Sequence, residues 1–206
     1  PISEEEIAVT IGKVDEVVEI ELVNYFIKGN IALTKVDEDY PDNKLSGAVF
    51  EVYSDTNGDG KLDKDDTLLG EMKELDGGVY QMSELRYGKY LVKETKAPTG
   101  FVLDENVYSV SVEENGKTYT VENKAGVGFI NAAQKGSLKI VKTSSDGKVE
   151  GFSFRVTGVD YDQTFKTDKN GEIVIEGLRI GDYTVSEVSD KASAGYILPA
   201  DKQATV

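Results

Sequence analysis

The sequence predicts an all-β chain of tandem β-sandwich domains, and three observations support this fold class. Apolar residues recur at every second position in short segments, as they do in strands with one buried face. Turn-forming clusters, such as ENGK at 114–117 and DKNGE at 168–172, separate these segments, and no stretch has the period of an amphipathic helix. Segments of similar sequence also occur twice along the 206 residues. Short alternating strands between turns are typical of a sandwich.

The internal repeat links the beginning and the end of a domain. Three segments recur after 93 to 107 positions, and the shortest interval indicates that the first copy carries extra residues. The matching pairs are KGNIALTKV at 28–36 with KGSLKIVKT at 135–143, LRYGKYLVKE at 85–94 with LRIGDYTVSE at 178–187, and ELVN at 21–24 with GFIN at 128–131.

These matches set the expected domain boundaries. Asn24 precedes the first copy just as Asn131 precedes the second, so residues 1–28 are expected to be the C-terminal strands of a preceding repeat. Residues 29–135 are then expected to form one complete domain. Residues 136–206 are expected to form a second domain without its final strands, because the first copy continues for two more strands beyond the equivalent point.

Polar residues interrupt the inward-facing positions of the predicted strands. In each copy, positions otherwise taken by Ile, Leu, Val and Tyr include one Lys and one Glu, and the terminal strand ends in Asn. The alternating sets are Val18, Ile20, Leu22 and Asn24; Ile31, Leu33 and Lys35; Tyr90, Val92 and Glu94; Leu138, Ile140 and Lys142; and Tyr183, Val185 and Glu187. Lys35, Glu94 and Asn131 are therefore expected to point into the core of the complete domain.

A buried amine beside a buried carboxylate has two explanations. Burial would lower the pKa of Lys35 and raise that of Glu94, so a proton passing between them would leave a nucleophilic amine beside a carboxylic acid. Attack on the Asn131 carboxamide, with Glu94 relaying protons and ammonia leaving, would give a Lys–Asn isopeptide bond. The alternative is a buried ion pair of Lys35 and Glu94, with Asn131 satisfying spare donors. Spacing alone favours the ion pair, because buried ion pairs are commoner than self-made cross-links.

Several segments of the complete copy resemble one known family. KGNIALTKVD, LSGAVFEVY, LRYGKYLVKETKAPTGF and a terminal strand ending in Asn look like the B-type collagen-adhesin repeat (CnaB-like), also called the SpaA-type pilin domain, of Gram-positive surface proteins. The resemblance implies tandem Ig-like (CnaB-type) β-sandwich domains. It also implies that Lys35 of the first strand joins Asn131 of the last, and that Glu94 promotes the reaction. Phe101 stands where the family has Tyr.

The second copy supplies Lys142 and Glu187 for the same roles. Its KASAGY segment at 191–196 departs from the family pattern, and no acceptor follows it in this sequence. Asn24 is an acceptor whose own Lys and Glu would lie upstream of Pro1. Two explanations stay open. The N-terminal strands of one molecule could complete the C-terminal repeat of another, placing Asn24 against Lys142 and Glu187, or both ends are products of trimming.

An acidic turn in the first copy has the spacing of a calcium-binding loop. Within SDTNGDGKLDKDDT at 54–67, six residues match positions 1, 3, 5, 7, 9 and 12 of an EF-hand-like loop. They are Asp55, Asn57, Asp59, Lys61 through its carbonyl, Asp63 and Asp66. The flanks are strand-like, so a helix-loop-helix sensor is not expected, and the alternative is a solvated hairpin turn. Calcium is the expected cofactor, and no organic cofactor is expected.

Composition and charge exclude several classes of function. The 38 Asp and Glu against 23 Lys and Arg give a formal charge of −15, which would repel the phosphates of a nucleic acid. Because the chain has no Cys and no His, it has no disulfide, no Cys/His zinc site and no His-dependent catalysis. No apolar run approaches the roughly 20 residues that span a bilayer, so we expect no membrane insertion.

The family resemblance implies an internal stalk segment of a wall-anchored adhesin or pilus on a Gram-positive cell surface. Such a segment makes its own cross-link once and is not an enzyme with turnover. The expected partners are neighbouring repeats of the same protein, with a host or glycan ligand at a tip outside this chain. The competing class is a ligand-binding adhesin module for host matrix protein or carbohydrate. The lack of Trp and the inward positions of Tyr90 and Tyr183 favour the stalk.

Overall fold

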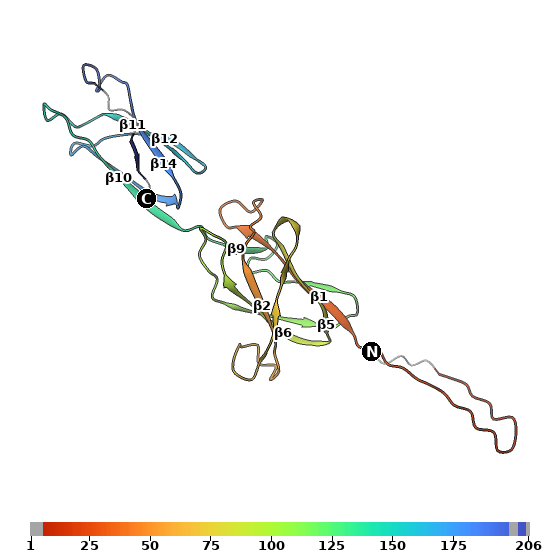
Figure 1. Cartoon of the computed structure of the whole chain (residues 1–206). Helices are drawn as coiled ribbons and strands as arrows, with labels where there is room; N and C mark the ends of the chain where they lie inside the picture. Colours follow the sequence, from red (N-terminus) through yellow and green to blue (C-terminus); the bar gives the residue numbers. More distant parts are fainter. Residues whose placement is uncertain (1–5, 198–201, 205–206) are drawn as a thin grey trace.

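The structure is a computed structural model that describes residues 6–197 and 202–204. The described residues contain strands, loops and one 3-10 turn at Asp76–Gly78, which confirms the all-β prediction. The N-terminal segment, a first group of strands and a second group follow one another along one direction (Figure 1). Within the described part of the chain, no helix is long and apolar enough to cross a bilayer.

The first domain contains the strands β1 to β9 in two sheets. One sheet has the order β4-β5-β1-β8, with β9 also paired to β1, and the other has the order β3-β2-β6-β7. The bounds are β1 (Lys28–Asp37), β2 (Val49–Ser54), β3 (Thr67–Glu71), β4 (Lys73–Glu74), β5 (Val79–Arg86), β6 (Gly88–Lys96), β7 (Val107–Val112), β8 (Thr118–Thr120) and β9 (Phe129–Asn131). Strand β1 is central, because β5 covers one of its edges and β8 and β9 cover the other.

The first and last strands of this domain run side by side and parallel. Parallel neighbours need a long connection, and here the whole remainder of the domain connects them. Asn131 therefore lies at the same end of the sandwich as Lys35. The paired residues are Lys35 with Phe129, Val36 with Ile130, and Asp37 with Asn131.

Aromatic rings fill the space between the two sheets near this end. Phe50 packs edge to face against Tyr80 and Phe129, with ring centres 5.1 and 4.9 Å apart. Tyr108 packs against Phe129 in the same way at 5.1 Å. Alternation along β1 adds Ile31 to this core, with 0% of its surface exposed. Any polar side chain on the same faces is consequently enclosed by apolar groups.

The second domain contains the strands β10 to β15. Its sheets have the orders β10-β13 and β12-β11-β14-β15. The bounds are β10 (Lys135–Val141), β11 (Ser153–Gly158), β12 (Tyr161–Lys166), β13 (Glu172–Arg179), β14 (Tyr183–Val188) and β15 (Lys202–Ala204). Residues 198–201 and 205–206 of the predicted second domain lie outside the described residues. Phe152 and Val156 are 1% and 0% exposed, so the two sheets of this domain pack against each other. Among the described residues, β10 pairs with β13 alone.

Residues 6–27 form no strand, which differs from the strands expected there. Val18, Ile20 and Leu22 keep their alternation but are 42%, 44% and 74% exposed. A two-stranded ribbon alone is marginally stable, and the described residues offer this segment no sheet to join. Residues 1–5 of the predicted acceptor segment lie outside the described residues.

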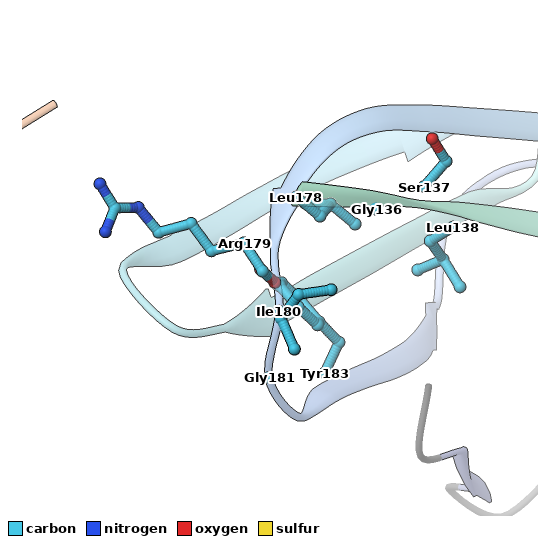
Figure 2. Close-up of a pocket in the computed structure, with 8 residues that line it drawn as sticks. All are labelled: Gly136, Ser137, Leu138, Leu178, Arg179, Ile180, Gly181 and Tyr183. Carbon is cyan, nitrogen blue, oxygen red and sulfur yellow. The ribbon is translucent and has the colours of Figure 1, made fainter. Parts of the chain in front are cut away.

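An ionic joint connects the two domains. Arg179, at the end of β13, donates hydrogen bonds of 2.6 and 2.8 Å to Asp37 and one of 2.9 Å to Asp39. Lys135 lies 2.9 Å from Asp39, and the Arg179 guanidinium lies 4.8 Å from the centre of the Tyr40 ring. Figure 2 shows Arg179 extending away from a small pocket at the start of β10. The joint therefore holds the second domain close to the end of β1.

Candidate functional site

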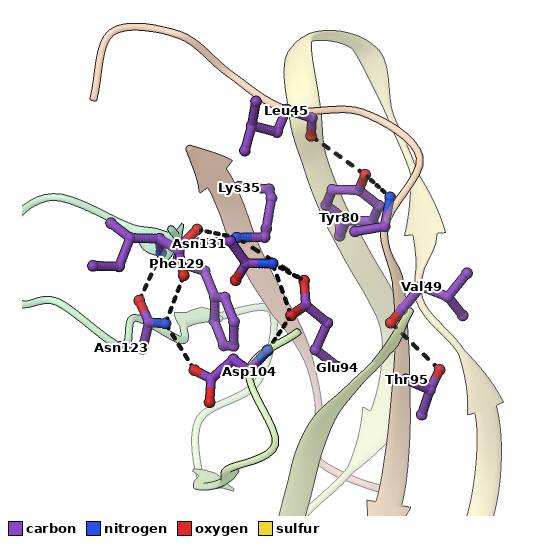
Figure 3. A network of polar contacts seen from close by, with 12 residues as sticks. Lys35, Leu45, Val49, Tyr80, Glu94, Thr95, Asp104, Asn123, Phe129 and Asn131 are labelled. Carbon is purple, nitrogen blue, oxygen red and sulfur yellow. Dashed lines mark hydrogen bonds and ion pairs between the residues drawn. The ribbon is translucent and has the colours of Figure 1, made fainter. Parts of the chain in front are cut away.

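Three polar side chains meet in the core of the first domain, each from a different strand. Lys35 comes from β1, Glu94 from β6 in the opposite sheet, and Asn131 from β9 (Figure 3). Their exposed fractions are 0%, 0% and 3%. Lys and Glu are almost never fully buried without a partner, so these residues form one unit. The structure thus brings together the three residues that the sequence predicts for the complete copy.

Hydrogen bonds hold the amine and the amide on either side of the acid. Lys35 Nζ lies 4.0 Å from Glu94 Oε1 and donates a 3.0 Å hydrogen bond to the carbonyl oxygen of Phe129. The Nδ2 atom of Asn131 donates to both Glu94 oxygens at 2.9 Å. The Lys35 amine and the Asn131 amide therefore both lie beside the Glu94 carboxyl group, and the amine is held against the last strand, β9.

Burial shifts both ionisable groups towards their neutral forms. Loss of water lowers the pKa of Lys35 to about 8, against the attraction of Glu94, Asp104 and Asp37. Burial raises the pKa of Glu94, against the hydrogen bonds that it accepts from Asp104 and Asn131. These two shifts reduce the cost of moving a proton from the amine to the carboxylate. The environment is therefore suited to an uncharged amine beside a carboxylic acid.

The Asn131 side chain presents its nitrogen, and not its oxygen, to Glu94. Nδ2 faces Glu94, and Oδ1 is buried without a hydrogen-bond partner. An ionised carboxylate only accepts hydrogen bonds, so the amide presents its donor to it. A protonated Glu94 would instead offer an O–H donor, which a half turn of the amide would pair with Oδ1. Buried polar atoms are normally hydrogen-bonded, so the unpaired Oδ1 atom of Asn131 is a place for the O–H group of a protonated Glu94.

Asn123 fixes the residue that precedes Asn131. Its Oδ1 accepts a 2.6 Å hydrogen bond from the N–H of Ile130, and its Nδ2 donates to the Ile130 carbonyl at 2.9 Å. Nδ2 also lies 2.8 Å from Asp104 Oδ2. Because both backbone groups of Ile130 are held, the position of Asn131 on the short strand β9 is set from outside the core.

Asp104 holds the carboxyl group of Glu94 in place in a similar way. Its backbone N–H donates a 2.8 Å hydrogen bond to Glu94 Oε2, and its carboxylate accepts one of 2.6 Å from the Tyr108 hydroxyl. Asp104 and Asn123 therefore connect Glu94 to the last strand. Sequence reasoning missed both residues, because single Asp and Asn residues near turns have the appearance of ordinary turn formers.

The second domain contains an incomplete version of the same site. Lys142 Nζ lies 2.9 Å from Glu187 Oε2, and their side chains are 12% and 2% exposed. The other oxygen of Glu187, Oε1, is buried and has no hydrogen-bond partner. Lys142 also lies 4.7 Å from the centre of the Phe152 ring. The structure brings the predicted Lys and Glu together, and the described part of this domain presents no Asn to them.

Asn24 is not part of either site. It lies in the exposed segment that precedes β1, and this segment extends from the end of the first domain opposite to the second domain (Figure 1). Among the six residues predicted for cross-linking, Asn24 is the one that the structure leaves apart.

The predicted calcium loop connects β2 and β3. Gly60 has φ of 75°, the left-handed conformation that a Gly at the sixth position permits. Within the described residues, no three His, Cys, Asp or Glu side chains gather as a metal site, so calcium stays a prediction. The side-chain oxygens instead accept backbone N–H groups of the same turn. The pairs are Asp55 with Gly58 and Gly60, Asn57 with Asp59, Asp59 with Lys61, Asp63 with Asp65, and Asp66 with Thr56 and Asp63.

A family model matches most of the chain. The model, SpaA, is described as a prealbumin-like fold domain, and it matches residues 29–125 and 136–206. No curated protein matches the chain.

Solved structures of several bacterial proteins are similar to this chain. The TIE protein of Bacillus anthracis is 26% identical, with a TM-score of 0.64, over 86% of this chain and 30% of that chain. This chain therefore spans less than a third of that protein. A streptococcal ancillary pilin is 20% identical over 87% of this chain and 59% of its own, with a TM-score of 0.39. The shaft pilin SpaA from Lactobacillus rhamnosus GG is 16% identical, with a TM-score of 0.40. The match covers 85% of this chain and 92% of the pilin chain.

Proposed function

Because the chain belongs to the SpaA family of prealbumin-like fold domains, we propose that it is a structural stalk segment of a Gram-positive surface adhesin or pilus. In this proposal the first domain links its first and last strands through an isopeptide bond between Lys35 and Asn131. The observation that carries the proposal is the fully buried Lys, Glu and Asn group on β1, β6 and β9. A stalk must resist pulling, and a covalent link between terminal strands provides that resistance.

The proposed reaction begins with a proton transfer from Lys35 Nζ to Glu94. The free amine then attacks Cγ of Asn131, while the protonated Glu94 donates a hydrogen bond to the amide oxygen. Glu94 next gives its proton to the departing nitrogen and takes one from the attacking nitrogen. The Cγ–Nδ2 bond breaks, the Nζ–Cγ bond forms and ammonia leaves. Glu94 ends in the state in which it met the amide, so the reaction occurs once and no substrate is turned over.

The bond changes how tension passes through the first domain. Tension enters at the start of β1, leaves through the connection from Asn131 to β10, and with the bond present crosses directly from Lys35 to Asn131. The residues between them are then outside the tensile path. The same closure restricts the unfolded chain, and for a loop of this length the chain-entropy model gives about 4 to 5 kcal/mol.

Calcium is proposed to stiffen the loop from Asp55 to Asp66. A carboxylate has about four acceptor sites, so an Asp that holds a backbone N–H retains lone pairs for a cation. Side-chain oxygens and the Lys61 carbonyl would supply the hard ligands that calcium prefers. The loop joins β2 to β3 and its ligands lie outside the cross-linking group, so calcium would act on local stability and take no part in bond formation.

The proposed partners are neighbouring repeats of the same protein, and the proposed location is the outside of the cell, with wall anchoring through other parts of the protein. The joint between the two domains supports this arrangement, because Arg179 binds Asp37 and Asp39 and aligns consecutive domains. A host or glycan ligand would then be bound by a tip that the stalk holds away from the surface.

Intact mass tests the proposed bond. The purified chain should be lighter than its sequence mass by one ammonia, and Glu94→Ala should restore the full mass because the proton relay is lost. Glu113→Ala changes an exposed Glu of the same domain and should keep the deficit. A parent chain with its full sequence mass would contradict the cross-link and leave a buried ion pair.

A further inference from the structure

We propose that the second domain positions Asn131 for the cross-link of the first domain, and that Arg179 is the positioning residue. This inference rests on the isopeptide chemistry proposed above and adds to it a residue from outside the domain that reacts. The interdomain joint lies at the end of the sandwich where β1 and β9 pair, and the last residues of this pairing are Asp37 and Asn131. Arg179 therefore contacts the residue of β1 that lies opposite the cross-linking Asn.

The position of Asn131 depends on a very short strand. Strand β9 has three residues, which pair with the end of β1. Because successive side chains of a strand point to opposite faces, a shift of one residue would turn the Asn131 side chain away from Lys35 and Glu94. A 3.1 Å hydrogen bond from the N–H of Glu38 to the Asn131 carbonyl closes the pairing at this end. The stability of this end therefore controls whether the acceptor faces the amine.

Arg179 is the partner that keeps Asp37 charged at this end. The side chain of Asp37 is 3% exposed. Its Oδ2 atom accepts a 2.6 Å hydrogen bond from Arg179 Nη1, and its Oδ1 atom accepts one of 2.8 Å from Nη2 and one of 2.9 Å from the N–H of Asp39. Burial acts to raise the pKa of Asp37, and the hydrogen bonds from Arg179 and Asp39 bring it below its ordinary value. Without the guanidinium, a nearly buried carboxylate would lose its bidentate partner, and the end of β1 would have to open towards water.

The chain that leaves β9 is held by both domains. In the first domain, the Ala132 carbonyl accepts a 2.9 Å hydrogen bond from the N–H of Val102, and the N–H of Gln134 donates one of 2.8 Å to the Gly100 carbonyl. In the second domain, the N–H of Ile180, the residue after the joint arginine, donates a 3.0 Å hydrogen bond to the Gln134 carbonyl. Two consecutive residues of the second domain therefore contact the end of β1 and the chain that follows β9.

These contacts join the two strands that carry the reactants. Arg179 holds the end of β1 and Ile180 holds the chain after β9, so docking of the second domain restricts sliding of one strand along the other. Lys135 adds an ion pair of 2.9 Å to Asp39 between the same two ends. Strands β1 and β9 are therefore connected through the second domain before any covalent bond connects them.

The contribution of Arg179 is confined to the period before the bond forms. Once Nζ of Lys35 is joined to Cγ of Asn131, the covalent bond holds the register of β1 and β9 by itself. Loss of Arg179 should therefore slow bond formation and leave the stability of the linked first domain unchanged. A residue that only supports the fold would instead change that stability and leave the rate of ammonia loss as it is.

Rates of ammonia loss in the full chain test this role. Freshly synthesised chains are quenched in acid at intervals, and intact mass gives the fraction that has lost ammonia. Arg179→Ala should react about tenfold to a hundredfold more slowly than the parent, since misplacement of reacting groups by about 1 Å can cost about a hundredfold. Arg179→Lys should lie between them, because Lys keeps the charge but cannot donate to Asp37 from two nitrogens. Arg155→Ala is the matched control: this exposed Arg pairs with Asp162 within the hairpin of β11 and β12, and the variant should react at the parent rate.

Hydrogen exchange tests whether Arg179 acts through the pairing of β1 and β9. In the Glu94→Gln background the proton relay is lost, so the two strands can be observed before any bond forms. Adding Arg179→Ala should speed the exchange of the Glu38 N–H, which donates to the Asn131 carbonyl, whereas adding Arg155→Ala should not. Equal exchange in the two double variants would overturn the positioning role.

The parent chain distinguishes failure of this inference from failure of the cross-link itself. A parent that keeps its full sequence mass would overturn the isopeptide chemistry and this inference with it. A parent that loses ammonia no faster than Arg179→Ala would leave the cross-link in place and overturn the positioning role alone. If Arg179→Ala unfolds the second domain, Arg179→Lys and Asp39→Ala decide instead, because Asp39→Ala changes the joint from the first domain. Both should react more slowly than Arg155→Ala, and rates equal to that control would overturn the inference.

Discussion

The two Lys and Glu pairs of this chain differ by the presence of one short strand. In the first domain, β9 covers the pair, Lys35 and Glu94 are both 0% exposed, and their closest atoms are 4.0 Å apart. In the second domain no described strand covers the pair, Lys142 is 12% exposed, and its amine lies 2.9 Å from Glu187. The uncovered site has the geometry of an ordinary ion pair.

This difference shows that the last strand does more than deliver the Asn. The Phe129 carbonyl of β9 accepts a hydrogen bond from Lys35, and the aromatic ring of the same residue closes the core over the amine. The strand thus draws the amine away from the carboxylate and excludes water at the same time. In the proposed reaction, the Lys and Glu pair would therefore become reactive only when the last strand lies beside it.

The largest expected effect comes from removing the acceptor of the first domain. Asn131→Ala should abolish the ammonia deficit and lower the free energy of unfolding by about 4 to 5 kcal/mol, because the loop from Lys35 is no longer closed. Chemical denaturation together with intact mass would measure both changes. The matched variant Asn43→Ala should keep the deficit and the stability. Equal stability of Asn131→Ala and the parent would show that β9 is not covalently held.

Calcium should affect the first domain and leave the second unchanged, because only the first copy contains the acidic loop. At a hundred times the dissociation constant, one bound ion adds about 2.7 kcal/mol to stability. Thermal unfolding with calcium and with a chelator would detect this shift, and Asp63→Ala should remove the response. Identical curves for the parent chain would identify the loop as a solvated turn.

The rate of bond formation should depend on pH through the proton shared by Lys35 and Glu94. Burial lowers the pKa of Lys35 to about 8 and raises that of Glu94, so the one-proton state dominates between these two values. Above about pH 8 the pair loses its proton, and the rate should fall about tenfold per pH unit. Below the raised pKa of Glu94 both groups are protonated, and the rate falls again. Acid-quenched mass spectra of freshly synthesised chain would give the profile, and a rate still rising at pH 10 would contradict it.

A smaller effect is expected from the residues that support the site. Asn123→Ala removes two hydrogen bonds to Ile130 and should destabilise the domain by about 1 to 2 kcal/mol. It should also slow the loss of ammonia without preventing it, because Lys35, Glu94 and Asn131 remain. Asn106→Ala is the control, since Asn106 bonds to Asp104 and does not touch the last strand. Equal rates for the two variants would argue against a positioning role.

The smallest effect on stability concerns the joint. Lys135→Ala removes an exposed ion pair with Asp39 and should change stability by less than about 1 kcal/mol. The hydrogen bond from Lys135 is the main cause of the lowered pKa of Asp39, so this contribution is present near neutral pH and disappears as acid protonates Asp39. Arg179→Ala should broaden the interdomain angles seen by X-ray scattering, because the guanidinium that holds Asp37 and Asp39 is removed. An unchanged scattering profile for Arg179→Ala would show that the linker alone aligns the domains.

Much of the fold could be predicted, because alternation and turn clusters are local signals. The same alternation placed Lys35 and Glu94 on the inward face, and the repeat identified Asn131 as the end of the last strand. Residues 6–27, where strands are predicted, form none, since a strand depends on a neighbouring edge as well as on its own sequence. Alternation cannot reveal whether that neighbour is present.

The supporting contacts of the site could not be predicted from the sequence. Asn123 acts through the backbone of Ile130, and Asp104 acts on Glu94 through its own backbone N–H. Backbone contacts of this kind depend on the path of a loop and leave no residue pattern. The interdomain contact of Arg179 with Asp37, 142 positions apart, was equally invisible, because both residues are also common on solvated surfaces.

The acidic loop between β2 and β3 lies within the ring that the proposed bond closes, between Lys35 and Asn131. An extracellular protease that cut this exposed turn would break the main chain once, yet the two fragments would still be joined through the side-chain amide. The filament would keep its continuity despite the nick. Damage tolerance of this kind would favour placing an insertion inside the ring rather than in the linker that follows Asn131.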